Sequence, residues 1–96
     1  MSYQKAELSP MQLQVMRAFH AKTRDYPEFS SDDFRSFNLH IYLRHINELG
    51  MLFRHGHQAG WISKTGKRKR SVIEGSHGRS IQLYRWTARG REVLKR

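Results

Sequence analysis

The chain has 96 residues, of which 18 are Lys or Arg and 8 are Asp or Glu, so its formal net charge is +10 at neutral pH. This length suits a single domain spanning residues 1–96, and a hydrophobic share of 38% suits a small core without an elaborate active-site pocket. The charge predicts a polyanionic partner. Nucleic acid is favoured over an anionic membrane, because the basic residues cluster in an expected loop rather than along an amphipathic helix.

Cysteine is absent from the sequence, which excludes disulfides, thiolate zinc sites and a cysteine nucleophile. The first residues lack the apolar run of a signal peptide, and no stretch approaches the roughly 18 apolar residues of a membrane span. We therefore expect a soluble, intracellular protein of the cytoplasm or nucleoid, or of the nucleus in a eukaryote. Residues 1–8 are expected to form a flexible N-terminus.

The first expected helix spans about 10–22. Ser9 is its cap, and Gln12 completes a capping box by reaching back to the amide of the cap residue. Apolar residues at three- and four-residue spacing define its buried stripe: Leu8, Met11, Val15, Met16 and Phe19. The proline after Tyr26 then favours extended backbone, so residues 26–29 are predicted to contribute a very short edge strand.

A second, short helix is expected next, capped by the serine at 30 or 31 and ending near Asn38, which tolerates turn conformations. Asp32 and Asp33 fall in its first turn, where the helix dipole favours negative charge. Capping accounts for both carboxylates, and no nucleophile, base and orienting group occur at credible spacing. We expect no catalytic residues and no enzymatic activity.

The third expected helix spans about 39–49, with Gly50 as a left-handed stop. Its inward residues are predicted to be Leu39, Leu43, Ile46 and Leu49. Residues 51–54 then read as a strand, although a helix that continues to His55 and stops at Gly56 fits the pattern as well.

Residues 56–80 form a glycine-punctuated basic region that is long for a loop. Segments 61–64 and 70–73 are predicted to pair as a small hairpin around residues 65–67, whose tip carries positive charge. The basic residues of the region are Lys64, Lys67, Arg68, Lys69, Arg70 and Arg79. An alternating strand at 81–86 and a helix capped by Thr87, with Val93 and Leu94 docking inward, complete the chain.

Two stretches resemble the winged-helix family, and especially small transcriptional regulators of the multiple-antibiotic-resistance and phenolic-acid-repressor type. One stretch is Ile46–Arg54, where a leucine-glycine pair is followed by two apolar residues and a basic residue. The other is Tyr84–Leu94, where a tyrosine is followed by the pattern Thr-x-x-Gly. The resemblance implies an α+β fold: a winged helix-turn-helix with a three-helix core, a small antiparallel sheet, a long basic wing at 56–80 and a short C-terminal helix. That wing is longer than the family's, and the long terminal helices of its dimers have no counterpart here, so a homodimer stays an open alternative.

In this interpretation the third helix lies in the major groove of double-stranded DNA, with an outer face made of Asn38, His40, Ile41, Arg44 and His45. Arg44 is the expected base contact, because a guanidinium matches guanine O6 and N7. The wing residues Lys64, Lys67, Arg68, Lys69, Arg70 and Arg79 are expected on phosphates or in the minor groove. The alternatives are that the helix residues merely face solvent and that the basic run is a solvated loop or a localisation signal.

Three other functions remain open from the sequence. Trp61, Tyr84 and Trp86 would stack on bases if the partner were RNA or a single strand. A protein-interaction module would use the charge for solubility or for an acidic docking surface. His55 and His57, with His77 or His45, form a weak candidate metal set, so we expect no metal, no cofactor and no small-molecule ligand.

Overall fold

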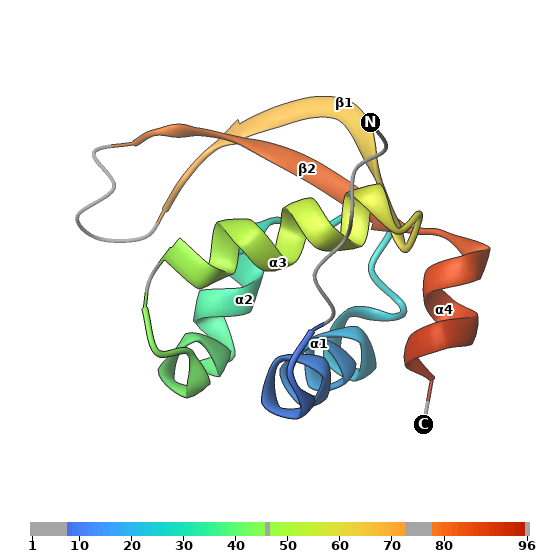
Figure 1. The fold of residues 1–96 in the computed structure, drawn as a ribbon. Coiled ribbons are helices and arrows are strands. Elements are labelled where there is room, and N and C mark those ends of the chain that lie inside the picture. Colours follow the sequence, from blue (N-terminus) through green and yellow to red (C-terminus); the bar gives the residue numbers. More distant parts are fainter. Residues whose placement is uncertain (1–7, 46, 73–77, 96) are drawn as a thin grey trace, which may run out of the picture.

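The computed structural model describes residues 8–45, 47–72 and 78–95, and these form a small α+β fold. The elements in chain order are α1 (Pro10–Thr23), α2 (Ser31–Ser36), the 3-10 helix η1 (Leu39–Tyr42), α3 (Asn47–Gln58), β1 (Ile62–Arg70), β2 (Ser80–Trp86) and α4 (Ala88–Leu94). Figure 1 shows the β1–β2 hairpin running above α3, with α1 below α3 and α4 at the right-hand side.

The predicted start of α1 is confirmed. The Ser9 hydroxyl accepts a hydrogen bond from the Gln12 amide at 3.1 Å, and the Ser9 amide donates to Gln12 Oε1 at 2.9 Å. These reciprocal bonds satisfy two backbone donors that have no partner within the helix, because the first turn has no preceding carbonyls. The cap therefore sets the register that places Val15, Met16 and Phe19 in the core.

The expected edge strand at 26–29 reduces to one bridge, at Phe29. Phe29 and Tyr84 exchange two backbone hydrogen bonds of 2.8 Å, so Phe29 pairs as a one-residue strand with the free edge of β2. Ser30 then caps α2, and its amide donates a hydrogen bond of 2.8 Å to the Asp33 carboxylate. Asn38 follows the helix with φ of 60°, the left-handed turn conformation that the sequence predicted near this position.

The predicted third helix is wrong in its boundaries. Residues 39–42 form a 3-10 turn, and the long helix is α3, which passes through Gly50 and ends before Gly60, whose φ is +81°. Helix α3 continues because Leu49, Leu52, Phe53 and Gly56 all lie in the core at helical spacing. Burial of that stripe outweighs the cost of two internal glycines, Gly50 and Gly56, about 1 kcal/mol each. The strand predicted at 51–54 is not formed. The alternative, a helix that continues to His55 and stops at Gly56, is correct about the helix but wrong about its end, because α3 runs through Gly56 to Gln58.

The hairpin also differs from its prediction. Residues 62–70 form a single strand that pairs with β2 in antiparallel register, from Ile62 opposite Trp86 to Arg70 opposite Ser80. Gly66, with φ of +85°, lies at a register irregularity between Lys64 and Arg68 and not at a turn tip. The remainder of the predicted second arm, at 73, lies outside the described residues. The basic residues at positions 64 and 67–70 therefore lie on strand β1.

Aromatic rings fill the centre of the core. Phe19 of α1 has no exposed surface, and its ring lies 5.1 to 5.9 Å, centroid to centroid, from the rings of Phe29, Phe34, Phe53 and Trp86. These four partners come from four other segments of the chain, so one cluster joins the helices to the hairpin. Edge and tilted contacts of this kind add about 0.5 to 1.5 kcal/mol per pair beyond burial.

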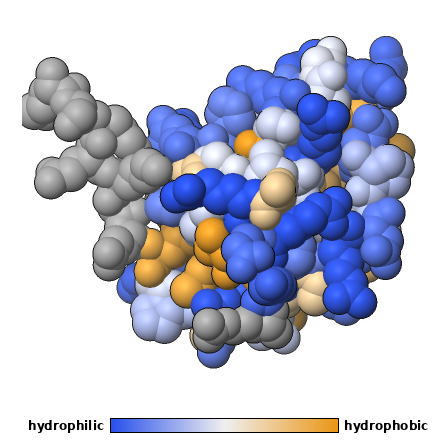
Figure 2. All heavy atoms as spheres, turned by 90° about the vertical axis from the view of Figure 1, so that its right-hand side faces the viewer, coloured by the Kyte–Doolittle hydropathy of each residue, from blue (hydrophilic) through white to orange (hydrophobic). Residues whose placement is uncertain are grey.

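Helix α4 docks on the connection between α3 and β1. The Thr87 hydroxyl accepts from the Gly90 amide at 3.0 Å, which caps α4, and it lies 2.5 Å from the Gly60 carbonyl and 2.9 Å from the Trp61 carbonyl. Leu94 is buried as predicted, whereas Val93 is 38% exposed. The surface on the α4 side of the molecule is mostly hydrophilic, with one smaller hydrophobic area at the lower left of the view (Figure 2).

Candidate nucleic-acid interface

The five residues predicted for the outer face of the third helix do not share a helix face. Asn38 is in the turn after α2, His40 and Ile41 are in η1, and Arg44 and His45 lie in the segment that leads to α3. The prediction that they share the outer face of one helix is wrong, because the long helix starts later, at Asn47. Their placement follows from the left-handed conformation of Asn38, which ends α2 and allows only one 3-10 turn before the chain extends at Leu43.

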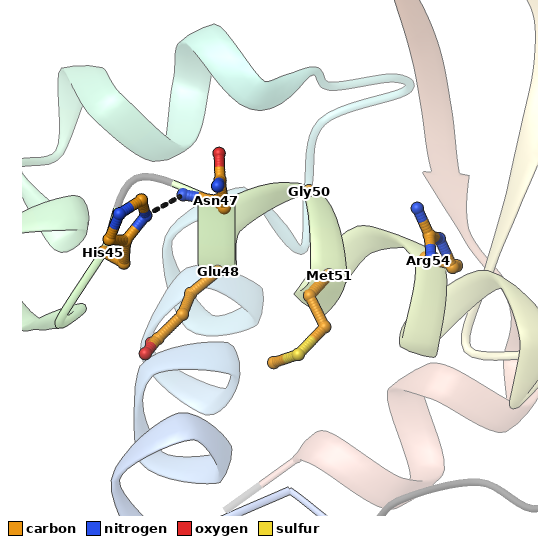
Figure 3. A pocket seen from close by; sticks show the side chains of 6 residues that line it. All are labelled: His45, Asn47, Glu48, Gly50, Met51 and Arg54. Carbon is orange, nitrogen blue, oxygen red and sulfur yellow. Dashed lines mark hydrogen bonds between the residues drawn. The ribbon is translucent and has the colours of Figure 1, made fainter.

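His45 has a structural role at the start of α3. Its Nδ1 accepts a hydrogen bond of 3.3 Å from the backbone amide of Asn47, the first residue of the helix (Figure 3). A helix leaves its first amides without internal acceptors, so the ring partly satisfies one of them. Arg44 and His45 are both exposed, and they lie just before the first turn of α3.

The outward face of α3 is the surface that the sequence interpretation missed. Asn47, Met51, Arg54 and Gln58 are exposed and repeat at four-, three- and four-residue spacing, which aligns them along one side of the helix. They lie opposite the buried stripe of α3. The sequence does contain a pattern that identifies this face. Residues 49, 52, 53 and 56 have helical apolar spacing, which predicts a polar face on the opposite side once Gly50 is placed inside the helix.

An open hollow lies over the first half of this face, lined by His45, Asn47, Glu48, Gly50, Met51 and Arg54. In the view of Figure 3, Asn47 and Arg54 point upward and Glu48 and Met51 point downward, so these side chains form the two edges of the outward face. Gly50 also lines the hollow, and a Cβ added there would meet no atom within 4 Å apart from its chain neighbours and the backbone of α3. The helix backbone is therefore accessible at this position of the hollow.

The predicted wing residues all lie on the hairpin or beside it, but along its strands. Lys64, Lys67, Arg68 and Arg70 are exposed on β1, Lys69 is half-buried on the same strand, and Arg79 is exposed just before β2. Arg68 is held across the hairpin, with Nε donating to Ser80 Oγ at 2.9 Å and Nη2 to the Ser80 carbonyl at 3.0 Å. The pairing of β1 with β2 thus holds the basic side chains in fixed positions along the hairpin. The end of the hairpin that carries residues 70 and 80 reaches toward the first turns of α3 (Figure 1).

A buried carboxylate anchors this end of the hairpin. Asp32 is 6% exposed, its Oδ1 accepts from the Ser71 hydroxyl at 2.8 Å, and its Oδ2 accepts from the Val72 amide at 2.8 Å. The sequence interpretation assigned both acids of α2 to capping, which holds for Asp33 but not for Asp32. Because charged acceptors make hydrogen bonds of about 1.5 to 3 kcal/mol, Asp32 fixes the end of β1 to the start of α2.

The aromatic residues that would have stacked on bases are largely inside the protein. Trp61 and Trp86 are 9% and 5% exposed, and Trp86 Nε1 donates to Thr23 Oγ1 at 2.9 Å. Tyr84 is half-buried against Phe29 and Phe53, and this burial raises its pKa, with Arg68 acting in the opposite direction. These three side chains therefore do not form a stacking platform.

The candidate metal set is not brought together. His55 and His57 lie on α3 and not on a strand, so their side chains leave the helix in different directions, and the His55 ring contacts Trp61. His77 lies outside the described residues. Within 8–45, 47–72 and 78–95, no group of three or more His, Asp or Glu side chains is placed to hold a metal ion, and no helix is long and apolar enough to cross a membrane.

The chain matches no protein-family model, no curated protein and no solved structure.

Proposed function

We propose that the chain is a winged-helix protein that binds double-stranded DNA and acts as a small transcriptional regulator. Helix α3 would lie in the major groove, and the basic hairpin would contact phosphates or the minor groove. The order of elements supports this proposal: a helix, a one-residue strand at Phe29, two helical segments, a helix and a hairpin follow the winged-helix arrangement.

The observation that carries the proposal is the outward face of α3. A major groove about 12 Å wide admits one helix, and base edges are read by side chains with amide or guanidinium groups. Asn47, Arg54 and Gln58 are such side chains, and all three are exposed on the side of α3 that the core leaves open. The hairpin beside α3 adds a dense set of cations to a chain of net charge +10, which favours phosphate contacts.

The alternatives are less well supported. RNA or single-strand binding by stacking would require aromatic faces at the surface, but Trp61 and Trp86 are buried. On the α4 side of the molecule, the surface is mostly hydrophilic apart from one smaller hydrophobic area (Figure 2), so this face offers little apolar surface to a protein partner. DNA binding uses the features that are exposed.

Equilibrium binding to a labelled random-sequence duplex, beside single-stranded DNA and duplex RNA of equal length, tests the proposal from low to physiological salt. We expect preference for the DNA duplex, with a salt slope equivalent to about five to eight phosphate contacts. Preference for RNA or for the single strand would move the function to those partners. Absence of binding at low salt would refute nucleic-acid binding and favour a protein partner.

A charge-matched pair of variants locates the contact. Lys64→Glu reverses an exposed charge on β1, and Lys95→Glu reverses one beyond α4, so both lower the net charge equally. We expect Lys64→Glu to weaken duplex binding and reduce the salt slope by about one to two, whereas Lys95→Glu has a much smaller effect. Equal losses for the two variants would show that net charge alone attracts DNA and would contradict hairpin docking.

A further inference from the structure

The hollow on α3 combines three kinds of surface that suit base edges better than phosphate. Met51 contributes an apolar thioether that is 42% exposed, Arg54 contributes a guanidinium, and Glu48 contributes a carboxylate on the rim. A carboxylate repels a phosphate group, so the sugar-phosphate backbone is a poor occupant. Base edges in the major groove present acceptors, donors and methyl groups, which match this mixture.

We propose that this hollow reads a guanine and a thymine close together, with Arg54 bonded to guanine O6 and N7 and with Met51 against the C5 methyl group of thymine. The inference rests on the proposed function and adds the class of base pair that the site selects. It predicts that the preferred duplex sites contain the two bases within about two base-pair steps of each other.

The spacing of the two side chains supports adjacent reading. Met51 and Arg54 are three residues apart on α3, a rise of about 4.5 Å along the helix axis. Base pairs are stacked about 3.4 Å apart, so side chains at this separation reach neighbouring or next-neighbouring pairs when the helix follows the groove. The two side chains also extend from opposite sides of the outward face (Figure 3), which lets them contact different bases without competing for space.

Gly50 makes close approach possible. Apart from its two chain neighbours and the backbone of α3, no atom lies within 4 Å of where a Cβ would be, so a base edge can approach the helix backbone at Gly50. Met51 adapts its shape to that edge, because its side chain is unbranched and flexible. A thymine methyl group buried against it would leave water, worth about 0.8 kcal/mol or a factor of about four in affinity.

The test begins with selection of binding sites from a randomised duplex pool by the full chain. The selected duplex is then remade with 7-deazaguanine, which lacks the N7 acceptor, or with deoxyuridine, which lacks the methyl group. For the unmodified protein we expect a loss of about five- to a hundredfold with 7-deazaguanine and of about fourfold with deoxyuridine. Arg54→Ala should lose sensitivity to the first change, and Met51→Ala to the second.

Arg24→Ala is the matched control, because Arg24 is exposed at the end of α1, away from α3, and carries the same charge as Arg54. It should keep both sensitivities, and melting curves should show that all three variants fold, since each changes an exposed side chain. Selective duplex binding that ignores both modified bases would overturn the inference and leave the proposed function standing. Absence of duplex binding would overturn both.

Discussion

Replacing Gly90 of α4 by alanine tests how this fold closes. A Cβ at position 90 would lie 2.1 Å from the carbonyl oxygen of Trp61 and 2.8 Å from its carbonyl carbon. Both atoms are backbone, so no side-chain rotation relieves the overlap and α4 must move away as a unit. The Thr87 hydroxyl, which joins the same carbonyl to the first turn of α4, would lose its geometry in that movement.

The expected cost follows from three effects. Overpacking costs about 1 to 3 kcal/mol. Loss of one hydroxyl hydrogen bond costs about another 1 kcal/mol. Alanine is favoured over glycine in a helix by about 1 kcal/mol, which acts in the opposite direction. Gly90→Ala should therefore destabilise the protein by about 1 to 3 kcal/mol and lower its melting temperature by at least about 4 °C.

Gly50→Ala is the matched control, since Gly50 is also helical but has open space where the Cβ would lie. It should be neutral or stabilise the protein by up to about 1 kcal/mol. Urea and thermal unfolding followed by circular dichroism measure both variants. If Gly90→Ala were as stable as the parent, or if the two variants shifted stability in the same direction, the close packing of α4 on Trp61 would be refuted.

Two further predictions concern buried polar groups. Asp32→Ala removes the acceptor of the Val72 amide, so hydrogen exchange at that amide should accelerate by at least about tenfold. Amides in the paired part of β1 should keep their protection. Unchanged exchange at Val72 would contradict the role of Asp32 in holding the end of β1. Burial, followed by repulsion from Arg91 and Arg24, lowers the pKa of His20 from its usual 6.5. The unfolded chain therefore binds the proton more readily, and the contribution of His20 to stability is complete above about pH 6.5 and declines as the pH falls below it. His20→Phe should reduce the pH dependence of the free energy of unfolding below that pH by up to about one proton, and an unchanged slope would exclude His20 as its source.

Local signals predicted the elements whose causes lie within a few residues. The capping box of Ser9 and Gln12 needs only four consecutive residues, and so does the Thr87 cap of α4, so their sequence patterns sufficed. Asn38 was expected at a turn for the same reason, because its tolerance of positive φ is a property of the residue itself. Net positive charge and its concentration between residues 64 and 79 are likewise readable without any fold.

The candidate interface was misplaced where two local signals competed. Gly50 follows a leucine and reads as a helix stop, yet α3 continues because Leu52, Phe53 and Gly56 find partners in the core. Shifting the helix in this way moves the outward face from residues near 44 to Asn47, Met51 and Arg54. A local preference of about 1 kcal/mol per glycine cannot decide such a case against burial of several large side chains.

The sequence by itself determined the composition, the caps, the strongly basic character of the 56–80 region and the approximate order of helices and strands. Tertiary structure alone decided which face of α3 is open, that Trp61 and Trp86 are core residues, and that Asp32 holds Ser71, which lies 39 residues further along the chain. The physical reason is that caps and charge depend on neighbouring residues, whereas exposure and long-range hydrogen bonds depend on which distant segments pack together.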